Sequence, residues 1–86
     1  MAYTVYSARN FEKIFEKRHG ERRAWLNSMK NILEQNPKLG KPLGGRLHKI
    51  WQLRIGPFRV WYKIDDKAQK VELLTVLHKD EAQHFY

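Results

Sequence analysis

Cysteine is absent from the 86-residue sequence. This absence excludes disulfides, iron–sulfur clusters and thiolate zinc sites, so an apolar core alone must hold the fold together. No apolar run approaches the ~20 residues of a membrane span, and the first residues lack the basic start and apolar centre of a signal peptide. The sequence therefore predicts a cytoplasmic protein with no segment that spans a membrane. Its length predicts a single domain over residues 1–86.

Acidic residues are missing from one long stretch. The 30 residues from Gln35 to Ile64 contain seven basic side chains and no acidic one, and they hold nearly all of the net charge of +8. A solvated basic surface is one explanation. The stretch also contains four aromatic residues, and basic side chains interleaved with aromatic ones suit a nucleic acid. The surplus favours an anionic partner: a nucleic acid, an acidic protein or a membrane surface.

Apolar periodicity predicts the order β-α-α-β-β-β. A strand is expected over residues 3–6 and two helices over about 8–18 and 21–35, with Ser7 as N-cap and Gly20 as a left-handed C-terminal residue of the first helix. Residues 37–45 read as a loop, and strands are expected over 47–55, 58–64 and 71–77. The apolar stripe of the second helix consists of Trp25, Met29, Ile32 and Leu33.

This order predicts an α+β fold. We expect an antiparallel sheet with the first strand parallel to the last, a helical hairpin on one face and a short helical tail at the C-terminus. The other face of the sheet is expected to be open to solvent. The strand over residues 71–77 is almost wholly apolar, which predicts a central strand buried on both faces.

The Gly-Pro pair at residues 56–57 predicts a two-residue type II′ turn. In that register Arg54 faces Arg59 across a hairpin, with Gln52, Trp61 and Lys63 on the same face. Like charges directly opposite each other cost about 0.2–1 kcal/mol, but an anion held between two guanidinium groups reverses that cost. Chance placement and a loop of different length remain alternative explanations.

The C-terminal residues include candidate proton-transfer groups. His78 and Lys79 follow the last strand, and His84 and Tyr86 come shortly afterwards. Histidine transfers protons near neutral pH, although a single surface histidine is more often inert. No metal-ligand spacing or phosphate-binding loop is present, so no metal and no cofactor are predicted.

The second half of the chain resembles a known family. Its elements are Gly44-Gly45, Leu53-Arg54, Gly56, the run from Phe58 to Tyr62, the apolar last strand, His78-Lys79 and Tyr86. In this order they resemble the RelE group of the RelE/ParE superfamily of toxin–antitoxin systems.

The resemblance implies an endoribonuclease that cleaves mRNA in the ribosomal A site. In this group the ribose 2′-hydroxyl attacks the adjacent phosphate without a metal, and cationic side chains stabilise the developing charge. Arg59 matches the arginine that contacts the scissile phosphate. Family members often carry lysines on the preceding strand, where this chain has Lys49, Gln52 and Arg54, so the general base is not identified.

The leading hypothesis is therefore a ribosome-dependent mRNA endoribonuclease neutralised by an acidic antitoxin, which would cover the basic face or displace the tail. A gyrase inhibitor of the ParE type and a non-catalytic RNA-binding module are the alternatives. The expected catalytic residues are Arg59, Arg54, His78, Lys79 and Tyr86, and the expected RNA-binding residues are Arg46, His48, Lys49, Gln52, Trp61 and Lys63.

Overall fold

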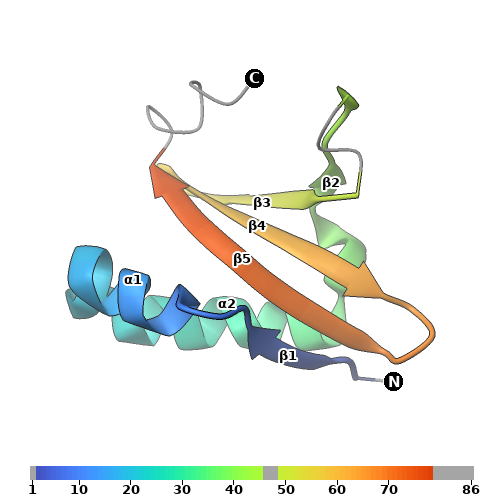
Figure 1. Cartoon of the computed structure of the whole chain (residues 1–86), viewed down its shortest axis with the longest axis horizontal. Coiled ribbons are helices and arrows are strands. Elements are labelled where there is room, and N and C mark those ends of the chain that lie inside the picture. The colour runs from blue at the N-terminus through green and yellow to red at the C-terminus, as the bar shows by residue number, and fades with distance from the viewer. Residues whose placement is uncertain (1, 46–48, 79–86) are drawn as a thin grey trace.

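The computed structural model describes residues 2–45 and 49–78. It shows a five-stranded sheet in the order β1-β5-β4-β3-β2, with two helices packed on one face (Figure 1). The strand β1 is parallel to β5, and the other neighbouring pairs are antiparallel. The strands are β1 (Thr4–Ser7), β2 (Lys41–Pro42), β3 (Trp51–Ile55), β4 (Phe58–Asp65) and β5 (Lys70–His78). The expected α+β architecture is thus confirmed for the sheet and the two helices, and the expected C-terminal tail lies outside the described residues.

The helices begin and end differently from the sequence-based expectation. The helix α1 (Phe11–His19) begins three residues late, because Ser7 ends β1 and its hydroxyl donates to the Glu12 carboxylate at 3.0 Å. Its N-cap is Asn10, with a left-handed φ of 71°. Gly20 is not left-handed, since its φ is −55°, and it starts the 3-10 turn η1 (Gly20–Arg22) that leads into α2 (Arg23–Gln35).

The main core lies between the helices and the sheet. Leu26, Met29 and Leu33 of α2 are fully buried there. The expected stripe was partly wrong, because Ile32 is 41% exposed and Leu26 takes its place in the core. Trp25 is half-buried and packs its ring 5.6 Å from that of Phe58.

A second, smaller apolar cluster lies on the other face of the sheet. Trp61 and Leu77 are each only 6% exposed, and Leu43, Ile50 and Leu74 pack against them. The sequence had suggested that this face is open to solvent. The cluster covers part of it, so that expectation is only partly met. The β4–β5 ladder passes from Trp61–Thr75 to Tyr62–Leu73, so Leu74 forms a bulge.

The loop expected over residues 37–45 contains further structure. A 3-10 turn, η2 (Pro37–Leu39), is followed by β2, which adds a short edge strand beside β3. The central strand is consequently β4, and β5 lies between it and β1. The expected burial of β5 on both faces is only partly met, because Glu72, Leu74 and Thr75 are half-buried. No helix among the described residues is long and apolar enough to cross a membrane.

Candidate anion-binding site

Arg54 and Arg59 face each other across the β3–β4 ladder, as the Gly-Pro register predicted. Gly56 has a φ of 60°, the left-handed value that the first position of the turn requires. Arg54 is exposed and Arg59 is half-buried. In the described part of the chain, neither guanidinium has an acidic partner. Two facing cations without a carboxylate are the arrangement that an anion would stabilise.

The Nε atom of Arg59 is buried and donates no hydrogen bond. Buried donors in folded proteins are nearly always satisfied, because leaving one unpaired costs about 1–3 kcal/mol. An anionic oxygen is the acceptor that a guanidinium binds most strongly. The Arg59 guanidinium therefore keeps a hydrogen-bonding position at Nε that no described residue uses.

A groove of about 370 Å³ opens beside this pair, between the η2–β2 segment and the hairpin of β3 and β4. Lys41 of β2 lies opposite Gln52 of β3, which places a third cation at the groove. Among residues 2–45 and 49–78, no acidic side chain lines it. The sequence does not reveal Lys41 as a site residue, because only the pairing of β2 with β3 brings it near the arginines. The groove is lined by Leu39, Gly40, Lys41, Gln52, Leu53, Arg54 and Arg59.

Tyr62 holds this segment against the sheet. Its buried hydroxyl donates to the Pro37 carbonyl at 2.7 Å and accepts from the Gly40 N–H at 3.2 Å. Burial raises the pKa of Tyr62 to about 12, so the phenol stays protonated and remains a donor. A Cβ atom on Gly40 would lie 2.6 Å from the Tyr62 hydroxyl and would also meet the Gln52 backbone, so only glycine fits.

Trp61 is not placed to stack on a base, which corrects its assignment as an RNA-binding residue. It is buried in the second apolar cluster, and its indole N–H donates to the side-chain oxygen of Gln52 at 2.8 Å. Gln52 itself is half-buried and lines the groove, as expected for a binding residue. The hydrogen bond from Trp61 fixes the orientation of the Gln52 amide.

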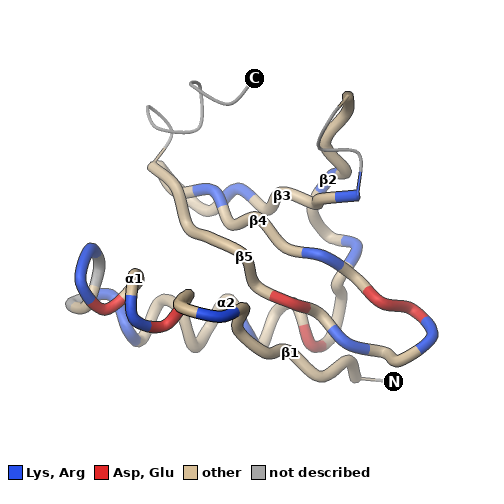
Figure 2. The backbone as a smooth tube through the Cα atoms, in the orientation of Figure 1, with Lys and Arg blue, Asp and Glu red and all other residues tan. Residues whose placement is uncertain are grey.

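Lys63 lies outside the groove of the arginine pair. It faces Glu72 in the ladder and lines a different hollow, near the β4–β5 turn. Three lysines and three carboxylates line that hollow, so their charges cancel: Lys63, Lys67 and Lys70 against Asp65, Asp66 and Glu72. Figure 2 shows the same contrast, with red segments at this turn and only blue ones along β3. Lys49 is exposed in the turn before β3, and Arg46 and His48 lie outside the described residues.

His78 lies on the opposite face of the sheet from the arginine pair. It is the ladder partner of Phe58, and its ring meets the Phe58 ring edge-on at a centroid distance of 5.9 Å. Arg59 is instead paired with Leu77. The expectation that His78 works beside the two arginines is therefore corrected, because adjacent strand residues point to opposite faces. Lys79, His84 and Tyr86 lie outside the described residues.

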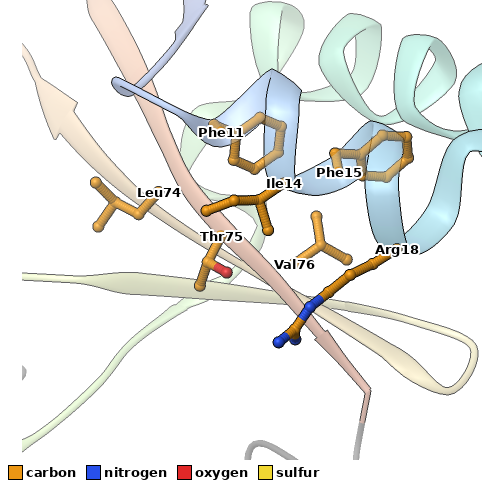
Figure 3. Close-up of a pocket in the computed structure, with 7 residues that line it drawn as sticks. All are labelled: Phe11, Ile14, Phe15, Arg18, Leu74, Thr75 and Val76. Atoms are coloured by element: carbon orange, nitrogen blue, oxygen red, sulfur yellow. The ribbon is translucent and has the colours of Figure 1, made fainter.

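An apolar pocket between α1 and β5 is a less suitable anion site. Phe11, Ile14 and Phe15 line it from the helix, and Leu74 to Val76 line it from the strand (Figure 3). Arg18 is its one charged lining residue. A mostly apolar lining suits an apolar side chain better than a phosphate.

The fold and the cationic hairpin define a class of small toxins. The chain matches the family described as ParE toxin of the type II toxin–antitoxin system, parDE, over residues 3–83. It is 32% identical to Toxin RelE of Mycobacterium tuberculosis over 80 residues, which cover 92% of this chain and 79% of that protein. The chain belongs to the RelE/ParE family of toxins from toxin–antitoxin systems.

Solved structures show the same fold. The toxin–antitoxin complex RelBE2 of M. tuberculosis contains a chain that matches with a TM-score of 0.82 and 29% identity, covering 91% of this chain and 99% of that one. The archaeal RelE–RelB complex of Pyrococcus horikoshii contains a match with a TM-score of 0.70 and 20% identity, covering 92% and 97%.

Proposed function

We propose that this toxin is a ribosome-dependent mRNA endoribonuclease acting in the cytoplasm. The observation that carries the proposal is the facing pair Arg54 and Arg59, in a groove that no acidic side chain of the described residues lines. A phosphodiester is the anion that two guanidinium forks bind through paired hydrogen bonds. The likeness to Toxin RelE of M. tuberculosis supports the same proposal.

The proposed reaction needs charge stabilisation at one phosphate. The ribose 2′-oxygen forms a bond to phosphorus, and the bond to the 5′-oxygen breaks, which leaves a 2′,3′-cyclic phosphate and a 5′-hydroxyl. One group takes the proton of the 2′-hydroxyl and another protonates the leaving oxygen. Arg54 and Arg59 would stabilise the charge on the phosphorane. Lys79 and Tyr86 stay the predicted proton-transfer residues, since His78 faces the other side of the sheet.

The test is a map of mRNA ends. Purified toxin is incubated with ribosomes that carry a defined mRNA codon in the A site, and the same mRNA without ribosomes is the control. New 5′-hydroxyl ends within the A-site codon, formed only on ribosomes, support the proposal. Intact mRNA under both conditions would exclude the nuclease, and binding without cleavage would identify a non-catalytic RNA-binding module.

Inhibition of DNA gyrase is the second candidate, because the matching family is described by the ParE toxin. A gyrase inhibitor would block supercoiling at about one toxin per enzyme and leave mRNA intact on ribosomes. The two assays, run with one toxin preparation, therefore separate the candidates.

The proposed protein partner is an acidic antitoxin. The M. tuberculosis and P. horikoshii relatives were solved as complexes of toxin with antitoxin. An acidic segment lying over the groove would neutralise Lys41, Arg54 and Arg59 together. Cross-links from the antitoxin to this groove or to residues 79–86 are expected, and cross-links confined to the opposite end of the sheet would contradict this assignment.

A further inference from the structure

We propose that Lys41, on the edge strand β2, binds a second phosphate of the same RNA strand, next to the phosphate held by Arg54 and Arg59. This inference rests on the proposed function and extends it from one phosphate position to two. The sequence placed Lys41 in a loop, and only the β2–β3 pairing gives it a role.

The ladder register sets the spacing of the three cations. Arg54 lies directly opposite Arg59, and Lys41 lies opposite Gln52, two residues before Arg54 on the same strand. Directly opposed residues have their Cβ atoms about 4.5–5.5 Å apart, and diagonal ones about 7–8 Å apart. The arginines therefore share one anion, whereas the lysine is displaced along the groove toward a neighbouring one.

The electrostatic surroundings of Lys41 favour a phosphate. Its side chain is exposed, lines the groove, and has no acidic partner among the described residues. Lys38, three residues earlier, forms an ion pair with Asp66 at 3.4 Å. Of these two lysines, Lys41 at the groove is therefore the one that no described carboxylate neutralises.

The backbone around Lys41 is held in place. The Tyr62 hydroxyl binds both Pro37 and Gly40, and Lys41 follows Gly40 directly. The Leu43 N–H donates to the Ile50 carbonyl at 2.8 Å on the other side of β2. A cation on a fixed edge strand loses less conformational entropy on binding than one in a mobile loop.

The same segment gives the groove an apolar wall. Leu39 is 52% exposed and lines the groove beside Lys41. A phosphate at Lys41 would bring the attached nucleoside close to this side chain, which offers contact area without selecting a base. The ligand class is accordingly a single-stranded RNA segment with at least two consecutive phosphates.

The experiment measures binding of a short single-stranded RNA with 2′-O-methyl groups, which cannot be cleaved because it lacks the attacking hydroxyl. Lys41→Ala is compared with Lys41→Arg and with Arg54→Ala. The matched control is Lys67→Ala, which removes another exposed charge, from the neutral hollow. Thermal melting of each variant confirms that it is folded.

Lys41→Ala is expected to weaken binding about five- to tenfold and to make the slope of log K against log salt shallower by about 0.7. Lys41→Arg should retain most of the affinity, and Lys67→Ala should match the wild type. If Lys41→Ala behaves like Lys67→Ala while Arg54→Ala weakens binding, the lysine site is wrong and the arginine site stands. If neither Lys41→Ala nor Arg54→Ala weakens binding, the proposed RNA site fails as a whole.

Discussion

Arg54 and Arg59 occupy directly opposed positions on β3 and β4, and no carboxylate of the described residues lines the groove beside them. Such a pair lowers stability unless an anion joins it. Under the proposed function the hairpin would exchange some stability for binding, and the consequence is measurable.

Replacing Arg54 by Thr should stabilise the free protein. The substitution removes the repulsion and introduces a residue that favours strands, so we expect a gain of about 0.2–1 kcal/mol in the free energy of unfolding at low salt. Urea unfolding measures this gain. Added phosphate should stabilise the wild type more than the variant, and equal stabilisation of both would show that the pair does not bind anions.

Replacing His78 by Phe should leave cleavage within a few-fold of the wild-type rate. The imidazole packs edge-on against Phe58 on the helix side of the sheet, and a phenyl ring preserves that packing. The measurement is the rate of mRNA cleavage on programmed ribosomes across the pH range. A loss near 100-fold would show that His78 takes part in the reaction.

Replacing Tyr62 by Phe should lower stability by about 1–3 kcal/mol. The variant leaves the buried Pro37 carbonyl and Gly40 N–H without their partner. Chemical unfolding gives the stability. Binding of the uncleavable RNA should weaken as well, because β2 loses an anchor, and unchanged binding would show that Tyr62 does not position Lys41.

Glu12 should contribute stability that disappears in acid. Hydrogen bonds from Lys30 and Arg23, at 2.8 and 2.7 Å, lower the pKa of Glu12 from 4.5 to about 2. A carboxyl with a lowered pKa in the folded state stabilises the fold above its unfolded pKa, and this stabilisation is lost as pH falls from about 4.5 toward 2.

The side chain of Glu12 is 44% exposed, so solvent screening reduces the effect to about 1 kcal/mol. Glu12→Gln should remove it, leaving a variant whose stability changes less over this pH range. Unfolding midpoints from pH 2 to 7 for both proteins measure the difference. Parallel curves would show that the cluster of Glu12 with Lys30 and Arg23 adds no net stability.

The sequence predicted the features that depend on neighbouring residues. The Gly-Pro turn fixed the register that places Arg54 opposite Arg59, and apolar periodicity identified both helices and the three long strands. The sequence did not predict features that depend on contacts between distant segments. Lys41 joins the groove through an edge strand of two residues, too short to leave a pattern.

Alternation along a strand did not predict the surroundings of two residues, Trp61 and His78. Trp61 is on the expected face, but Leu43 and Ile50 cover it, and no local pattern shows which loop lies over a face. His78 was predicted to be a proton-transfer residue from its position at the end of the last strand. The face on which it lies depends on the ladder of β5 with β4, in which a bulge shifts the alternation.

The central claim is that Arg59 stabilises a scissile phosphate. The direct measurement is the single-turnover rate of mRNA cleavage on programmed ribosomes by wild type, Arg59→Ala and the control Lys67→Ala. Loss of one preorganised donor predicts that Arg59→Ala cleaves at least about 100-fold more slowly than the wild type. Lys67→Ala is expected to cleave at the wild-type rate. Cleavage by Arg59→Ala at the wild-type rate would contradict the account.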